Sequence, residues 1–356
     1  MKTFLHPLQN LAEMEAIYTK AKSNRGILEI SGCMESQKAH LIYGLSGLFT
    51  SHLILAEDEK AAKELYEDYR FYDKNVYYYP AKDLLFFQAD IHGNLLIRQR
   101  MRVLKALLEQ KENITVVTSI DGCMDYLQPL DKIEKQLIHF RNDSTLDMDK
   151  LKDALVHMGY ERVGQVEMPG QFSVRGGIVD IYSLTEENPW RIELWGDEID
   201  SIRTFDSQSQ RSLENLDEIT IYPATEQPAE KGGVSFLDYF AEKNSLVFLD
   251  EPNRLEENAR AVEEEFCQSC ENRQQKGEEN ISQNWMCRWE DLNHKLNNRN
   301  CISVSLMEPK RADWKITEQF NLTVKSMSSY QSSFELLVKD FRQYKKQGYQ
   351  IVLLSS

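Results

Sequence analysis

The chain has 356 residues, of which 41% are hydrophobic and 28% charged, and its formal net charge is -15 at pH 7. This length allows two or three domains with sizeable cores, and the balance of apolar and charged residues excludes an intrinsically disordered chain. The excess of negative charge repels a phosphate backbone over the molecule as a whole, so general attraction to nucleic acid is not the expected main activity.

No run of the sequence reaches the roughly 18 apolar residues that a membrane span needs, and the N-terminus lacks the basic and then apolar order of a signal peptide. We therefore expect a cytoplasmic protein without a membrane partner. Six cysteines are few for this length and fit reduced thiols. Cys267 and Cys270 form a C-x-x-C pair in an acidic helical stretch, but without a second close pair ordinary helix cysteines are favoured over a zinc site.

Residues 1–129 are expected to form the first part of an α/β domain. After a helical lead-in over residues 1–25, the hydrophobic pattern alternates between strands and helices. The predicted strands are 27–30, 52–55, 76–79 and 114–118, and the predicted helices are about 37–49, 59–72 and 95–110. In the last helix Arg98 and Arg102 share a face at the four-residue spacing, which is typical of a solvated helix surface. Alternating strands and helices imply a mainly parallel sheet with helices packed on it.

The segment from Gly32 to Ala39, Gly-Cys-Met-Glu-Ser-Gln-Lys-Ala, lies between the first strand and helix, where a phosphate loop of the form G-x-x-x-x-G-K-[ST] is expected. Gln37 replaces the second glycine, which lets backbone amides close around phosphate, and Ala39 lacks the hydroxyl that ligates Mg²⁺. Glu35 adds a negative charge beside these amides. The pattern favours a degenerate nucleotide site, in which Lys38 is an ordinary residue at the start of a helix.

The α/β alternation stops near Pro129, which marks a plausible boundary. A strand at 133–141 and a helix at 148–158 are predicted next, followed by several short β-rich runs. A linker-like run with prolines and glycines then extends from Pro223 to Gly233. We therefore expect residues 130–222 to form an inserted α+β domain of about ninety residues.

Within this insertion, the side chains of residues 190–195 alternate between two faces, since successive strand side chains point in opposite directions. The even-numbered residues are apolar, while Arg191, Glu193 and Trp195 form the other face. A charge, a counter-charge and a large aromatic are typical of binding hot spots, although a solvated strand with one exposed aromatic is the alternative. Gly196-Asp197 fits a two-residue hairpin turn, so the chain should return antiparallel.

Residues 223–356 are expected to complete the α/β domain. The apolar strand from Leu246 ends in Asp250 and Glu251, the usual position of the Mg²⁺-holding acid of a P-loop ATPase, although a buried strand that runs into an acidic loop is equally consistent. Helices are predicted at 255–275 and 334–346 and a strand at 350–354. Because the chain stops inside an apolar strand, we expect it to be a fragment of a longer protein. The predicted fold class is α/β, with a degenerate P-loop domain and an inserted α+β domain.

Two runs of this sequence carry a family resemblance. They are Gln171–Tyr182, Gln-Phe-Ser-Val-Arg-Gly-Gly-Ile-Val-Asp-Ile-Tyr, and Arg191–Ile199, Arg-Ile-Glu-Leu-Trp-Gly-Asp-Glu-Ile. Both closely resemble the motif of the UvrB-like module in nucleotide excision repair proteins. The continuation from Phe205 to Ser212 resembles in particular the transcription-repair coupling factors (Mfd), and weaker similarity extends over nearly the whole chain. The resemblance implies a UvrB-like fold in which the loop at Gly32 and the acids at Asp250 are relics of a nucleotide site.

The resemblance also implies a function. It indicates a module that recruits UvrA to stalled RNA polymerase for transcription-coupled nucleotide excision repair. The domains that bind RNA polymerase and translocate DNA are expected beyond this chain, and the fragment itself is expected to need no cofactor and to have no enzymatic activity. The alternative, from another class, is an active UvrB-like or helicase-like ATPase that acts on damaged DNA. Gln37 and Ala39 argue against this alternative.

The UvrA contacts of this family carry over to this sequence as Arg175, Arg191 and Trp195. The family often has Phe at the last of these positions, so Trp195 differs in size but keeps an aromatic face. Because Arg191 lies opposite the apolar face of its strand, its removal is expected to weaken UvrA binding while the fold survives.

Overall fold

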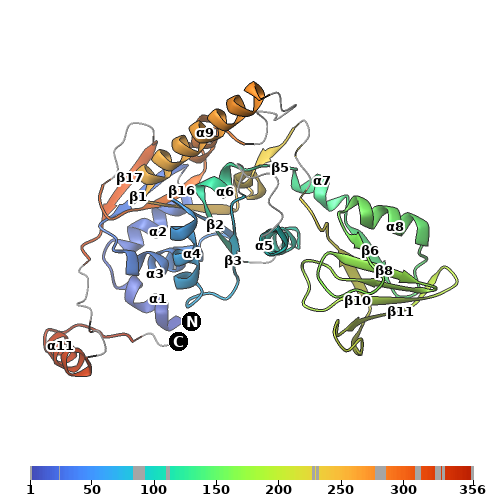
Figure 1. Cartoon of the computed structure of the whole chain (residues 1–356). Coiled ribbons are helices and arrows are strands. Elements are labelled where there is room, and N and C mark those ends of the chain that lie inside the picture. The colour runs from blue at the N-terminus through green and yellow to red at the C-terminus, as the bar shows by residue number, and fades with distance from the viewer. Residues whose placement is uncertain are drawn as a thin grey trace.

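The computed structural model describes residues 2–23, 25–82, 93–109, 113–226, 229, 232–276, 286–308, 314–324, 330 and 333–353. Figure 1 shows two lobes, a larger one that contains both ends of the chain and a smaller β-rich one that holds its middle part. Pro228, in the predicted linker, lies outside the described residues. Within the described part, no helix is both long and apolar enough to cross a membrane.

A seven-stranded parallel sheet forms the centre of the larger lobe, in the order β17-β1-β16-β15-β2-β4-β3. Its strands are β1 (Gly26–Ser31), β2 (Ser51–Ala56), β3 (Val76–Tyr79), β4 (Ile114–Ser119), β15 (Ser245–Asp250), β16 (Asn300–Val304) and β17 (Ile316–Asn321). Strands β1, β4 and β15 are buried along their whole length, which explains their continuous apolar sequences. The predicted α/β fold class is confirmed.

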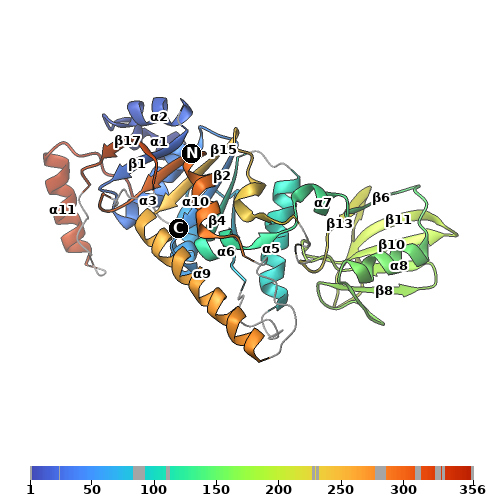
Figure 2. The ribbon, with the colours of Figure 1, turned by 90° about the horizontal axis from the view of Figure 1, so that it is seen from above.

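Helices cover both faces of this sheet. One face is covered by α1 (Lys2–Gln9), α2 (Met14–Ser23), α3 (Glu35–Ser46) and α4 (Glu59–Tyr69), and the other by α5 (Gly93–Leu108), α6 (Ile120–Met124), α9 (Pro252–Gln275) and α10 (Trp289–Asn297). Strand alternation separates the two cores: in β2, Ile54 packs with the first group, whereas Leu53 and Leu55 pack with the second. Figure 2 shows α9 running along the larger lobe and α5 facing the smaller one.

The smaller lobe contains a six-stranded sheet in the order β12-β11-β10-β9-β8-β7. The strands are β7 (Glu161–Arg162), β8 (Gln171–Arg175), β9 (Ile178–Ile181), β10 (Trp190–Trp195), β11 (Glu198–Phe205) and β12 (Ser212–Leu216), all antiparallel to their neighbours except for the β7–β8 pair. Helix α8 (Met148–His157) contributes Leu151 and Leu155 to the core that contains Ile192. A separate antiparallel pair joins β6 (Ile138–Arg141) to β13 (Glu218–Ile221).

One predicted strand is confirmed only in part, and another is wrong. Of the strand predicted at 133–141, residues 138–141 form β6. Its beginning belongs to helix α7 (Leu130–Glu134), because Pro129 at the N-cap sets a fixed backbone angle and Asp131 in the first turn favours a helix start. The predicted strand at 350–354 has no strand structure over 350–353, which follow α11 (Phe334–Lys346). Those described residues pair with no neighbouring strand, and an apolar run without such a partner cannot satisfy its backbone in a sheet. Residue 354 lies outside the described residues.

The two lobes are joined where the chain leaves the larger lobe and returns to it. At this crossing β5 (Tyr126–Leu127) pairs with β14 (Val234–Ser235). Helix α5 adds contacts from its side chains: Arg98, which was predicted on a solvated face, donates from Nη2 to the backbone oxygen of Glu186 at 3.0 Å, and Lys105 forms an ion pair with the Glu186 carboxylate. Glu186 lies in the smaller lobe, so α5 contacts both lobes.

Arg100 of α5 is completely buried between the two crossing segments. Its Nη1 lies 2.7 Å from Asp125 Oδ2, on the outgoing segment, and its Nε lies 2.5 Å from Glu226 Oε1, on the returning one. The Nη2 group donates to Glu226 Oε2 at 3.1 Å, and the guanidinium carbon lies 4.1 Å from the centroid of the Tyr79 ring. Burial alone would raise the pKa of Glu226, but Arg100 and Lys82 lower it to about 2. Arg100 thus contacts both crossings, and Lys82 adds a second ion pair to Glu226.

We predict that Arg100→Met lowers the free energy of unfolding by about 3 kcal/mol or more, because it removes the ion-pair partner of the buried Asp125 and leaves the buried Glu226 with Lys82 alone. Arg102→Met is the matched control, since Arg102 is partly exposed on the same helix, and it should cost less than about 1 kcal/mol. Urea unfolding of the full chain measures both. Equal effects of the two substitutions would show that the buried ion cluster does not stabilise the crossing.

Candidate functional site

The first candidate site is the connection between β1 and α3. Helix α3 begins at Glu35, so only residues 32–34 form a loop, and Gln37 and Lys38 lie within the helix. The amide of Cys33 donates to Ser305 O at 3.0 Å and that of Gln37 donates to Met34 O at 2.8 Å. A phosphate cradle needs several loop amides that point to one ligand, and these two amides are already paired within the protein.

Gly32 and Ala39 lie at opposite ends of this segment. Gly32 has φ +80, and a Cβ atom there would lie 2.0 Å from the backbone oxygen of Leu322. Glycine is therefore required for packing against the segment after β17. Ala39 is buried in the core of the first helix layer, among side chains such as Leu41 and Ile42.

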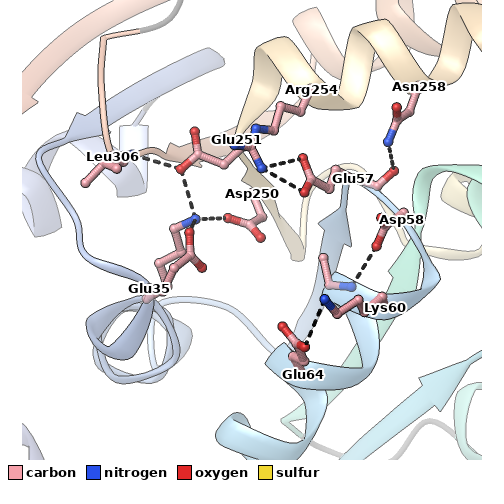
Figure 3. A network of polar contacts seen from close by, with 12 residues as sticks. Glu35, Glu57, Asp58, Lys60, Glu64, Asp250, Glu251, Arg254, Asn258 and Leu306 are labelled. Carbon is pink, nitrogen blue, oxygen red and sulfur yellow. Dashed lines mark hydrogen bonds and ion pairs between the residues drawn. The ribbon is translucent and has the colours of Figure 1, made fainter. Parts of the chain in front are cut away.

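Lys38 is the centre of a buried ion cluster, with only 1% of its side chain exposed. Its Nζ lies 2.7 Å from Glu35 Oε1, 2.7 Å from Asp250 Oδ1 and 2.9 Å from Glu251 Oε1. Figure 3 shows the three carboxylates converging from the start of α3 and the end of β15. The structure thus brings the predicted lysine and the two predicted acids together. Lys38 is a buried residue whose ion pairs join α3 to the end of β15. This corrects its interpretation as an ordinary residue at a helix start.

The charge balance of this cluster is uneven, because three carboxylates surround one ammonium group. Burial alone lowers the pKa of Lys38, but the carboxylates outweigh it and raise that pKa. Burial also raises the pKa of Asp250, to about 6, against the opposing effect of Lys38. Glu35 and Glu251 add to the rise because they repel a further negative charge. The rise at Lys38 therefore comes from its three carboxylate partners, whereas the rise at Asp250 comes mainly from burial.

Glu251 links this cluster to the long helix α9. Its backbone has φ +52, an uncommon conformation for a residue with a side chain, at the position just before Pro252 starts the helix. Its carboxylate accepts from the Leu306 amide at 2.8 Å as well as from Lys38. The Glu251 carboxylate and the Lys38 ammonium group, which would meet Mg²⁺ and phosphate in a P-loop ATPase, are thus engaged with protein partners. Figure 3 shows the network continuing to Arg254 and Glu57.

We predict a pH dependence of stability from Asp250. Its pKa is raised in the folded state, so the folded chain binds this proton more tightly than the unfolded chain does. The resulting stabilisation is present below about pH 4 and is lost as the pH rises through about 6. Between these values the unmodified chain should lose roughly 2 kcal/mol relative to Asp250→Asn.

Thermal and urea unfolding at several pH values between 4 and 7 test this prediction. Asp149→Asn is the control, because Asp149 is exposed, and it should follow the unmodified chain throughout. A constant difference between the unmodified chain and Asp250→Asn over this range would contradict the assignment.

The second candidate site is the polar face of the six-stranded sheet. In β10, Trp190 and Ile192 are buried, Arg191 and Glu193 are partly exposed, and Trp195 is 84% exposed. The predicted alternation of faces is therefore confirmed. Trp195 pairs with Glu198 across a two-residue turn whose first residue, Gly196, has φ +64. This is the predicted hairpin, with glycine where a side chain would be strained.

Asp180 joins the two predicted arginines on this face. It is completely buried on β9, directly opposite Arg191 in the strand register. Arg191 donates from Nε to Asp180 Oδ1 at 2.7 Å and from Nη2 to Oδ2 at 2.8 Å, while Arg175 donates from Nη2 to Oδ2 at 2.7 Å. Arg191 also donates to Gln210 Oε1 at 3.0 Å, and its guanidinium lies 4.2 Å from the centroid of the Phe205 ring.

The two arginines therefore differ in accessibility. Arg175 keeps 47% of its side chain exposed, whereas Arg191 keeps only 13%. Removal of Arg191 would leave the buried Asp180 carboxylate with fewer donors, which destabilises a fold. The expectation that Arg191 can be removed without cost to folding is corrected accordingly. Asp180 was quoted in the sequence motif but was not recognised as a partner, although a carboxylate within an apolar strand signals a buried ion pair.

Charged pairs of both signs lie on this face. Arg203 forms an ion pair with Glu193, which also accepts from Ser201 Oγ at 3.3 Å. The exposed Glu198 lies directly opposite Trp195 in the strand register. At Asp180, by contrast, two arginines share one carboxylate and leave a net charge of +1. The whole chain carries -15, so this arginine pair is a small positive patch on an acidic protein.

The cysteines do not form a visible metal site. Cys267 and Cys270 lie on α9, where Cys267 is exposed and Cys270 is buried against the core. Among the residues that the structure describes, no group of three or more histidine, cysteine, aspartate or glutamate side chains is arranged to hold a metal ion.

Comparisons with known proteins agree with the resemblance seen in the sequence. Residues 138–226 match the UvrB interaction domain family. The transcription-repair-coupling factor of Bacillus subtilis is 37% identical over 222 residues, which are 57% of this chain and 19% of that protein. That of Staphylococcus haemolyticus is 38% identical over 151 residues, 42% of this chain and 13% of that protein. That of Staphylococcus epidermidis is 25% identical over 340 residues, 79% of this chain and 29% of that protein.

The similarity to transcription-repair-coupling factors is thus confirmed, and it covers most of this chain. The chain spans less than a third of the length of each of these relatives. The region that matches the UvrB interaction domain contains the whole six-stranded sheet, including Asp180 and both arginines that contact it.

Proposed function

We propose that this chain is the UvrB-like module of a cytoplasmic transcription-repair coupling factor and that its smaller lobe recruits UvrA. Two findings support this proposal: the similarity to transcription-repair-coupling factors, and the match of residues 138–226 to the UvrB interaction domain. The observation that carries it furthest is that the exposed Trp195 and the positive patch at Asp180 lie on the same sheet within that matched region. RNA polymerase and DNA would bind to other parts of such a protein, which would also supply its ATP-dependent translocation.

The chemistry of this face suits an acidic protein partner with an apolar contact point. Arg175 offers fork-like donors that match a carboxylate, and its exposed half lies at the rim of the sheet. Trp195 offers a large apolar area at low entropic cost. The strongly negative remainder of the chain would steer an acidic partner away from other surfaces and toward this patch.

We predict that Trp195→Ala weakens UvrA binding roughly thirtyfold, or about 2 kcal/mol, because a central aromatic anchor is lost. Its thermal unfolding should be unchanged, since the side chain is largely exposed. Leu213→Ala is the matched control, because Leu213 is an exposed apolar residue on β12 of the same sheet. Affinity measured by calorimetry or interferometry with purified UvrA decides the matter. Normal binding by Trp195→Ala would refute the assignment of this face.

The nucleotide site in the larger lobe is proposed to be degenerate. The early start of α3, the paired loop amides and the occupation of Lys38 by three carboxylates support this. A triphosphate would have to displace Glu35, Asp250 and Glu251 from Lys38 and would meet their repulsion. On this account the alternative function, an active ATPase within this chain, lacks the phosphate site that it needs.

We predict that titration of MgATP up to millimolar concentration into the full chain gives no saturable heat. Lys38 is already paired with three carboxylates, and the amides of Cys33 and Gln37 are already hydrogen-bonded within the protein. Lys38→Ala serves as the comparison. Micromolar binding by the unmodified chain that disappears in Lys38→Ala would establish a working nucleotide site and overturn this part of the proposal.

A further inference from the structure

Asp180 is a buried carboxylate on a face whose other charged side chains reach solvent. Arg191 approaches it side-on from β10 with two hydrogen bonds, and Arg175 approaches the same oxygen, Oδ2, from β8, the other strand of the hairpin that contains Asp180. The two Nη2 atoms lie 2.7 Å and 2.8 Å from that oxygen, so two guanidinium groups meet at a single anion. Without this anion the like charges would repel each other.

The two arginines are held to different degrees. Arg191 is fixed on several sides, by Asp180, by Gln210 and by the face of Phe205, and only 13% of its side chain is exposed. Arg175 lies at the end of β8, next to the turn at Gly176, and about half of it is exposed. Its contact with Asp180 fixes one edge of the guanidinium, and the remaining donors stay accessible.

We propose that Asp180 is a positioning residue for the partner-binding face. It holds Arg175 in the orientation that presents its remaining N–H donors to solvent on this face, and Arg191 acts chiefly by fixing Asp180. This inference rests on the proposed function and deepens it, because it separates the arginine that contacts the partner from the pair that orients it. Preorganised donors bind a partner carboxylate more tightly because less side-chain entropy is lost on association.

Asp180→Asn tests this inference with little change in shape. The amide removes the anion and places N–H donors against the guanidinium donors, so Arg175 should leave its position while its charge remains. We expect UvrA affinity to fall about tenfold, less than for Arg175→Ala, for which we expect about thirtyfold. Arg141→Ala is the control, since Arg141 is an exposed arginine that is ion-paired to Glu218 in the same lobe.

A double-mutant cycle in the full chain separates positioning from general stability. If Asp180 acts through Arg175, then Asp180→Asn should cost less than about twofold in a chain that already carries Arg175→Ala. A loss of about tenfold in both backgrounds would overturn the inference, because Asp180 would then act independently of Arg175. If Arg175→Ala itself binds UvrA normally, the proposed function of this face fails instead.

A second readout needs no partner. The Nε–H signals of the arginines in a ¹⁵N-labelled chain report the order of each side chain on the picosecond to nanosecond timescale. In Asp180→Asn the order of Arg175 should fall, while Arg203, which is paired with Glu193, should keep its order and show that the sheet remains folded. Unchanged order of Arg175 would overturn the positioning role, whatever the result with UvrA.

Discussion

The arrangement of the two lobes depends on one buried cation. Arg100 lies between Asp125 and Glu226, the residues that flank the path into and out of the smaller lobe. These residues are far apart in sequence, and the guanidinium compensates the buried charge of both carboxylates, with Lys82 assisting at Glu226. With α5 also in contact with Glu186, the smaller lobe has a defined position on the larger one. The proposed partner-binding face, which lies on the smaller lobe, therefore has a defined position relative to the larger lobe.

Buried charges are compensated by opposite charges at both candidate sites, but the consequences for ligand binding are opposite. At Lys38 three carboxylates occupy a cation that would otherwise bind phosphate, so the site is closed by its own protein. At Asp180 two cations share one carboxylate, so positive charge remains and faces outward through Arg175. The ratio of acids to bases in each cluster decides whether it can take a ligand. The proposed function combines an inert nucleotide site and a docking face in one chain on this basis.

Much of the fold could be predicted because its signals are local. The buried strands of the parallel sheet have continuous apolar sequences, and the helices between them have clear periodicity. Strand β17 was missed because it alternates between partly buried and exposed residues and gains its stability by pairing with β1. Helix α10 was missed inside a polar stretch, where three residues, Trp289, Leu292 and Leu296, carry the core face.

The sites were predictable only in part, because some of their features depend on residues that are distant in sequence. The spacing of β10 correctly places Trp195 on the exposed face, because period-two alternation is a local property. The partners of a buried charge are not local: Arg100 meets Glu226, 126 residues further along, and Lys38 meets Glu251, 213 residues further along. Arg191 was for this reason interpreted as a free contact residue, whereas its main partner is Asp180 in the same lobe.

Hydrogen–deuterium exchange of the full chain, alone and with UvrA or MgATP, tests the central claim most directly, because it reports both sites in one experiment. The account predicts that UvrA slows exchange in β8 and in the hairpin of β10 and β11, and that MgATP leaves the segment from Gly32 to Ala39 unchanged. Protection of that segment by MgATP, or no protection of the hairpin by saturating UvrA, would contradict it.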